Sequence, residues 1–142
     1  MKKLSDLPEL LQNMEPRLAD GLFFMASVNE SQTTSIADHL EYILCIYREK
    51  EGITLVLSEE VKKDMEGLSG EPVAGPFALI TLDVFSDLMS IGFLAKVTES
   101  LAEEGISVNA FSAYHHDHLL VPYDKREEAM RVLKELQGKK KE

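Results

Sequence analysis

The sequence has little cysteine, little positive charge and no long apolar run, and each shortage excludes a class of protein. Cys45 is the single cysteine among 142 residues, so no disulfide can form within the chain, and a reducing compartment, the cytoplasm, is expected. Fifteen Lys and Arg against twenty-five Asp and Glu give a formal net charge of −10, which repels nucleic-acid backbones and anionic membrane surfaces. No segment approaches the roughly 18 consecutive apolar residues of a membrane span, and Met1 to Leu7 lack an apolar signal core.

Motifs of the commonest enzyme classes are missing as well. The eight glycines form neither a GxGxxG fingerprint nor a P-loop, and no GxSxG elbow occurs. The one basic run, Lys139 to Lys141, stands at the end of the sequence, where a solvated tail is expected. We therefore predict a protein that is not an enzyme and holds no cofactor, with neither nucleic acid nor membrane as a partner.

Apolar periodicity divides the chain into alternating helices and strands. Asp6 or Ser5 can cap a first helix that extends to Leu18, with Pro16 disturbing its last turn. The expected helices cover residues 7–18, 58–67, 91–104 and 124–136, and the expected strands cover residues 22–28, 42–47, 53–57, 77–84, 106–114 and 118–121.

A weak internal repeat organises these elements into two units. Thr54 to Leu68 aligns with Leu119 to Leu133 at a constant offset, so strand, cap and helix coincide. The Gly- and Pro-rich segment 69–76 is the expected boundary, which gives an N-terminal unit of residues 1–70 with a shortened first helix and a C-terminal unit of residues 71–142. Each has the order of a ferredoxin-like α+β sandwich, an antiparallel sheet with helices on one face. The second unit lacks a last strand. The segment Leu22 to Val28 is one candidate to supply it, and the sequence leaves open which of the two sheets contains that strand.

The turn from Ser86 to Phe93 is the first candidate binding site. It leads into a helix whose free N–H groups and positive dipole end attract a carboxylate, and Gly92 allows close approach to the backbone. Asn109 on the next strand offers a donor and an acceptor for an amino acid, and Phe111 shares its strand face by alternation. An ordinary helix cap with a polar strand residue explains the same pattern.

A histidine cluster, His115, His116 and His118 around Asp117, is the second candidate site. In an extended segment His116 and His118 share a face and could bind a metal ion, with His39 as a distant third ligand, which would make a metal-dependent enzyme. A polar hairpin turn is the favoured interpretation, because two ligands at i and i+2 without a Cys or Glu partner form a poor site.

The sequence also resembles a known family. The segment LITLDVFSDLMSIGFLAKVTESLAEEGISVNAF resembles the signature of ACT domains, and residues 4–137 as a whole resemble small uncharacterised double-ACT proteins akin to the regulatory region of aspartate kinases. The matching features are LLQNMEPRL followed by GLFF, the REKEGITLVL hairpin, and the stretch from ISVNAF to HHDHLLVP. The resemblance implies tandem βαββαβ domains with a regulatory role.

The resemblance also implies a ligand site and a partner. ACT domains bind amino acids, commonly between two units, so a homodimer or higher homo-oligomer is expected. The chain lacks the Pro-Gly pair found in this loop of many ACT domains. A purely structural homo-oligomer, with sheets paired edge to edge, is the alternative. The ligand-binding residues that follow from the resemblance and from the local pattern together are Asp87, Met89, Ser90, Ile91, Gly92, Phe93, Asn109 and Phe111.

Overall fold

The computed structural model describes residues 3–138, so the basic run Lys139 to Lys141 lies outside the described residues. No helix in this part of the chain is long and apolar enough to cross a membrane. The chain forms two compact units. One, here called the composite unit, contains the described residues up to Asp20 together with those from Ala78 onward, and the other, the inserted unit, is Gly21–Phe77.

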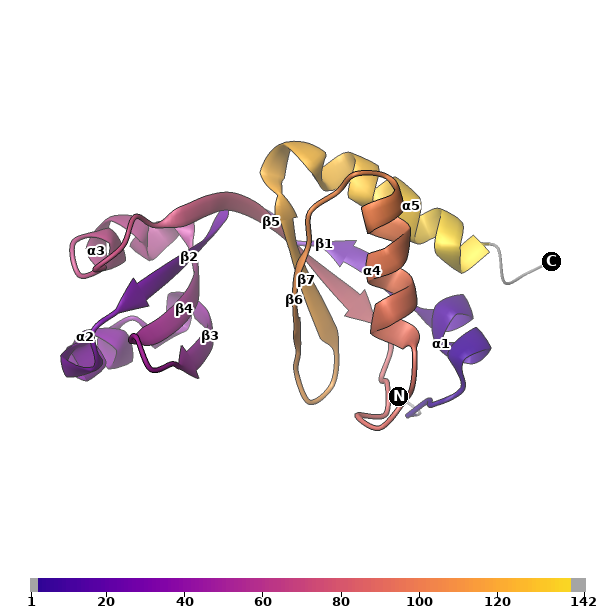
Figure 1. Ribbon diagram of the computed structural model, residues 1–142, viewed down its shortest axis with the longest axis horizontal. Coiled ribbons are helices and arrows are strands. Elements are labelled where there is room, and N and C mark those ends of the chain that lie inside the picture. Colours follow the sequence, from indigo (N-terminus) through magenta and orange to yellow (C-terminus); the bar gives the residue numbers. More distant parts are fainter. Residues whose placement is uncertain (1–2, 139–142) are drawn as a thin grey trace. The chain divides into compact units, whose positions relative to one another are not determined.

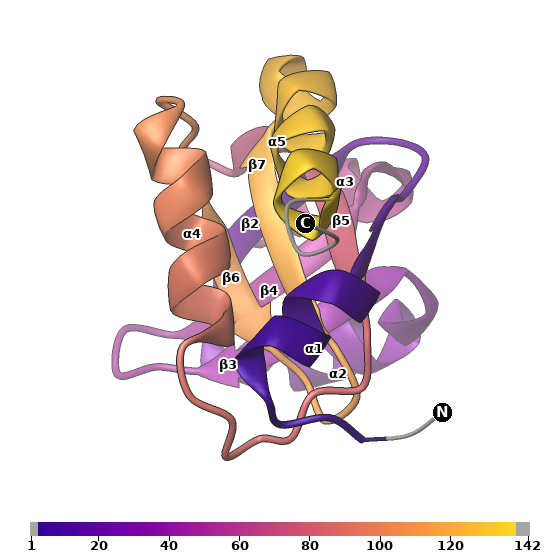
Figure 2. The same cartoon turned by 90° about the vertical axis from the view of Figure 1, so that its right-hand side faces the viewer.

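The composite unit is a four-stranded sheet with helices on one face (Figures 1 and 2). Its hydrogen-bonded strand order is β1-β5-β7-β6. The helices α4 and α5 lie side by side over the sheet, and α1 lies near the end of α5 (Figure 2). The elements are α1 (Leu7–Asn13), β1 (Glu15–Leu18), the second part of β5 (Ala74–Asp83), α4 (Phe93–Glu103), β6 (Asn109–Ser112), β7 (Asp117–Pro122), the 3₁₀ turn η4 (Tyr123–Lys125) and α5 (Arg126–Gly138).

The strand that completes this sheet is β1, which the sequence analysis had placed in a helix. The Asp6 side chain caps α1 as expected, accepting the Glu9 N–H at 3.2 Å. The helix nevertheless ends before Pro16, because proline cannot donate the backbone hydrogen bond that a continuing helix needs. Residues 15–18 instead pair antiparallel with β5, with Pro16 opposite Leu82. The segment Leu22 to Val28, whose sheet the sequence left open, pairs with β4 inside the inserted unit.

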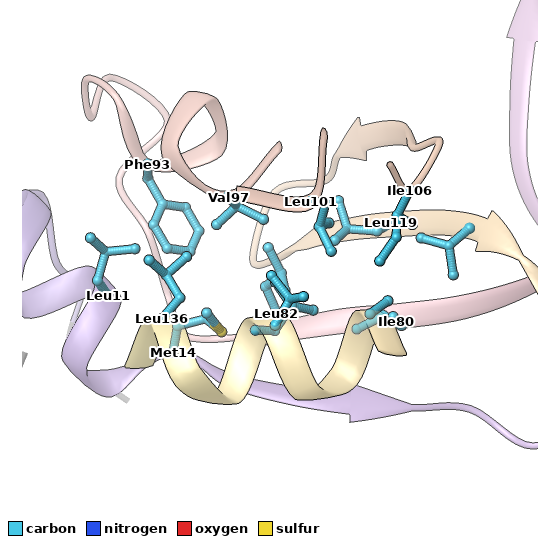
Figure 3. Close-up of a cluster of buried hydrophobic side chains, with 14 of the residues drawn as sticks. Leu11, Met14, Ile80, Leu82, Phe93, Val97, Leu101, Ile106, Leu119 and Leu136 are labelled. Carbon is cyan, nitrogen blue, oxygen red and sulfur yellow. The ribbon is translucent and has the colours of Figure 1, made fainter. Parts of the chain in front are cut away.

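The core of the composite unit lies between the sheet and its helices (Figure 3). Phe93, Val97 and Leu101 point down from α4 at helical spacing, onto Ile80 and Leu82 of β5. Helix α1 and the residue that follows it contribute large side chains that are essentially fully buried, namely Leu10, Leu11 and Met14. Residues from both ends of the sequence therefore make one hydrophobic core.

The inserted unit repeats the same topology with shorter helices. Its strand order is β3-β4-β2-β5, and its core contains Leu55 and Leu57 of β4 packed with Ile36, Val61 and Met65 from the helical layer. Helix α2 has six residues against eleven in α4. The elements are β2 (Phe23–Val28), η1 (Glu30–Gln32), α2 (Thr33–Asp38), η2 (Leu40–Tyr42), β3 (Ile43–Arg48), β4 (Ile53–Ser58), η3 (Glu59–Val61), α3 (Lys62–Glu66) and the first part of β5.

The strand β5 belongs to both units. Ala74 and Phe77 pair with β2, whereas Ile80 to Asp83 pair with β1. The first part of β5 is thus the last strand of the inserted unit, and its second part is the first strand of the composite unit. Both units then have the strand order 4-1-3-2 of a βαββαβ fold. The predicted fold class, tandem ferredoxin-like α+β units, is confirmed. The two compact units divide the chain after Asp20 and after Phe77, whereas the sequence prediction divides it after residue 70.

Candidate functional site

Two hydrogen bonds to Leu4 and one hydrogen bond within the loop hold the segment between β5 and α4. The Leu4 N–H donates to the Phe85 carbonyl at 2.8 Å, and the Asp87 N–H donates to the Leu4 carbonyl at 2.7 Å. The Asp87 carboxylate accepts the Met89 N–H at 2.9 Å, which closes a short turn. Gly92 then enters α4 with a φ of 89°, a left-handed conformation that favours glycine. No side chain among the described residues caps the helix, so the N–H groups of its first turn keep their capacity to bind a ligand.

A cavity of about 160 Å³ lies at this end of α4. Its wall combines the loop, the first turn of the helix and the adjoining ends of β6 and β7. It contains two carboxylates and three hydroxyl groups but no Lys, Arg or His. The lining residues are Ser86, Asp87, Leu88, Ser90, Gly92, Phe93, Leu94, Ala95, Ser112 and Asp117. We call this the α4 cavity.

Asp117 is the functional candidate that the sequence analysis missed. It is the first residue of β7 and lies opposite Ser112 of β6. Because alternate strand residues share a face, it points to the helical side of the sheet, as do Leu119 and Val121 in the core. Its side chain lines the α4 cavity although the residue is only 8% exposed. Alternation counted back from Leu119 would have found it, but residues 115–117 were interpreted as a turn.

The expected loop residues divide into two groups. Asp87, Ser90, Gly92 and Phe93 line the cavity. The Phe93 side chain is buried in the core (Figure 3). Met89 and Ile91 are not among the lining residues, and they are 84% and 87% exposed.

The two expected strand residues, Asn109 and Phe111, lie on the opposite face of the sheet from the α4 cavity. Asn109 pairs with Leu120, and Phe111 pairs with His118, so both share the face away from the helices. Phe111 stacks on His118 with a ring distance of 5.3 Å. The structure therefore does not bring Asn109 together with the first turn of α4.

The histidines of the second candidate site each have ordinary structural partners. His118 Nδ1 lies 2.9 Å from the Thr81 hydroxyl, and His116 Nδ1 lies 3.2 Å from the Val84 carbonyl oxygen. His115 contacts the rings of Phe85 and Tyr114. Within residues 3–138 no group of three or more His, Cys, Asp or Glu side chains is placed to hold a metal ion.

His39, which was considered as a third metal ligand, belongs to the inserted unit. Its Nδ1 lies 2.6 Å from the Ser35 carbonyl oxygen, and its Nε2 lies 3.3 Å from the Asp64 carboxylate. The interpretation of these histidines as part of a polar hairpin turn agrees with the contacts of residues 113–116, since the Ala113 N–H donates to the His116 carbonyl at 3.0 Å. Asp117 and His118 already belong to β7.

A second, shallower hollow of about 290 Å³ lies on the open face of the composite unit, beside Arg17, Thr81, Asp83 and His116. Its charges are paired internally, because Arg17 Nε donates to Asp83 Oδ2 at 2.5 Å and His116 Nε2 lies 3.7 Å from Asp83 Oδ1. Hydrogen bonding to Asp83 raises the pKa of Arg17 above its ordinary value, so this guanidinium stays charged. The paired groups leave little free charge for a ligand.

Burial of His118 makes the free energy of unfolding depend on pH. Desolvation lowers the pKa of its imidazole, and the charge of His116 lowers it further. The folded protein therefore binds fewer protons at His118 than the unfolded chain does. The contribution of the neutral His118 to the free energy of unfolding is fully present above about pH 6.5 and is lost as the pH falls toward the lower pKa of the folded state. We expect the free energy of unfolding to fall less between about pH 7 and pH 5 in His118→Gln than in the wild type. Urea denaturation at both pH values measures this, with the exposed His115→Gln as control; equal losses in all three proteins would contradict it.

Comparison with known proteins identifies the class. Two family models described as "ACT domain" match in tandem, one over residues 4–73 and the other over residues 77–135. The chain therefore belongs to the ACT-domain family and carries two such domains. No curated protein matches the sequence.

Solved structures agree with this assignment. A protein of unknown function from Vibrio cholerae, described as a possible transport protein, is 36% identical, with a TM-score of 0.75 over 92% of this chain and 95% of that one. A protein from Agrobacterium tumefaciens is 19% identical, with a TM-score of 0.68 over 87% of this chain and 89% of that one. The regulatory subunit of aspartate kinase from Thermus thermophilus, in a ligand-free form, shares the fold at 10% identity, with a TM-score of 0.67 over 89% of this chain and 97% of that one.

Proposed function

We propose that this protein is a non-catalytic regulatory module that binds a small amino acid in the α4 cavity. One observation carries the proposal: the uncapped first turn of α4 faces a cavity that also contains the buried carboxylate of Asp117. The N–H groups and the positive dipole end of a helix bind carboxylates. The regulatory subunit of aspartate kinase, which shares this fold, supports a regulatory role.

The size of the α4 cavity favours a small ligand. Its volume of about 160 Å³ corresponds to about five water molecules at roughly 30 Å³ each. Glycine, alanine and serine, with about five to seven heavy atoms, are of this size.

A structural homo-oligomer is the competing function. Leu88, Met89 and Ile91 are 62%, 84% and 87% exposed and form the outer surface of the same loop. Apolar side chains of this kind are frequent at subunit contacts. The two functions differ in one measurable respect, because a structural oligomer needs no small ligand.

Calorimetric titration of the full chain with each of the twenty amino acids, together with melting curves, tests the proposal. We expect heat with at least one small amino acid and, at about 100 times its Kd, a rise in Tm of roughly 5–10 °C. Ala95→Glu adds a carboxylate to the cavity wall and should abolish binding, because it repels the ligand carboxylate. Ala102→Glu is the matched control, since this exposed alanine lies on the same helix but does not line the cavity. Neither heat nor a Tm change with any amino acid would overturn the proposal.

A further inference from the structure

We infer that Asp117 is the acceptor for the ammonium group of the ligand, so that the α4 cavity selects molecules with a protonated amine. The inference rests on the proposed function of the cavity but adds a residue and a ligand class to it. The structure places Asn109, the ammonium acceptor expected from the sequence, on the opposite face of the sheet.

Asp117 is the buried charge of the α4 cavity. It is 92% shielded from solvent, with a relative exposure of 8%, and it lies on the helical side of the sheet, where the neighbouring inward positions are Leu119 and Val121. Among the described residues no ion pair includes its carboxylate, and the cavity wall has no cationic side chain. Two carboxylates in a wall without a cationic side chain give the cavity a negative field, which is complementary to a cation.

The second carboxylate of the cavity, that of Asp87, stabilises the loop. Asp87 Oδ1 accepts the Met89 N–H within the loop turn, so this group holds the loop. Ser86 and Ser112 stand beside Asp117 in the wall and offer hydroxyl oxygens. An alkylammonium has three donors, which Asp117 and two hydroxyl groups can satisfy together.

The two ends of the site then require a particular class of ligand. The first turn of α4 presents N–H donors to a negative group, and Asp117 presents an acceptor to a positive group, within a cavity of about 160 Å³. An α-amino acid carries both charged groups on one carbon atom. A 2-hydroxy acid of the same shape lacks the cation and would leave Asp117 without a charged partner. Loss of one partner of a buried charge pair typically costs about 2–5 kcal/mol, which corresponds to a roughly 30-fold or greater loss of affinity.

Calorimetry with three probes tests this on the full wild-type chain. L-alanine carries both charged groups, L-lactate replaces the ammonium with a hydroxyl, and ethylamine lacks the carboxylate. We expect lactate to bind at least about 30-fold more weakly than alanine. Equal affinities for alanine and lactate would overturn the role of Asp117 and leave amino-acid binding intact. This comparison needs no variant, so it does not depend on how a substitution folds.

Two charge-matched variants assign the effect to one residue. Asp117→Asn should weaken alanine binding at least about 30-fold and remove the preference over lactate. Asp124→Asn removes the same charge from an exposed residue of η4 that does not line the cavity, so it should stay within a few-fold of wild type. A folded Asp117→Asn protein that binds alanine as the wild type does would overturn the inference. If ethylamine binds through Asp117 while no amino acid does, the inference stands and the proposed function fails; if no probe binds, both fail.

Discussion

Deletion of residues 1–19 is expected to unfold the composite unit. The deletion removes the edge strand β1 and three side chains that are at most 1% exposed, Leu10, Leu11 and Met14. Truncation of one such side chain to alanine typically costs about 2–5 kcal/mol, so the three together account for roughly 6–15 kcal/mol if their costs add. The whole stability of a domain is about 5–15 kcal/mol. The amides of β5, β6 and β7 should therefore lose their protection from hydrogen exchange.

A circularly permuted chain is the control for this deletion. Residues 4–19 can be moved behind residue 138 through a flexible Gly/Ser linker of about ten residues, which spans roughly 16–19 Å. The end of α5 already lies beside α1, since Gln137 Nε2 donates to the Gln12 carbonyl at 3.2 Å. We expect the permuted protein to recover the exchange protection that the deleted protein loses. A deleted protein as stable as the full chain would show that β1 and α1 contribute little.

The reason this strand escaped sequence analysis is physical. Residues 15–18 have the sequence EPRL, with only Leu18 as a strongly apolar side chain and with a proline. Such a segment becomes a strand because β5 offers it a free edge, which is a tertiary contact and not a local preference. By contrast, β3, β4 and β7 were predicted within one residue of their observed bounds, because each hairpin combines apolar runs with a polar turn. The strand β6 was predicted too long, over residues 106–114 instead of Asn109–Ser112.

The sequence predicted the loop part of the candidate site better than its strand part. Ser90 and Gly92 were found because a loop that enters a helix has a recognisable polarity and a glycine with positive φ. Asn109 was chosen for its chemistry, yet a shift of one residue along a strand moves a side chain to the other face. Ala110 and Ser112 are the β6 residues that face the helical side, opposite Leu119 and Asp117. The face of the sheet on which a strand side chain lies depends on where each strand begins.

Phe93→Ala is expected to weaken both the fold and ligand binding. The Phe93 side chain is 3% exposed and packs in the core beside Val97 and Leu101 (Figure 3), so its removal should cost about 3–5 kcal/mol in urea denaturation. Its backbone belongs to the wall of the α4 cavity. A looser anchor lets the first turn of α4 move, which should lower the affinity for an amino acid bound in the cavity as proposed.

Two variants separate these effects. Phe93→Leu keeps most of the buried volume, so it should lose less stability than Phe93→Ala and retain binding. Met89→Ala removes an 84% exposed side chain of the same loop and should change the free energy of unfolding by no more than about 0.5 kcal/mol. Calorimetry at a temperature where every variant is folded compares their affinities. If Phe93→Ala lost stability but bound the amino acid with unchanged affinity, the donors that hold the ligand would have to be fixed by the loop and its contacts with Leu4, not by the burial of the helix start.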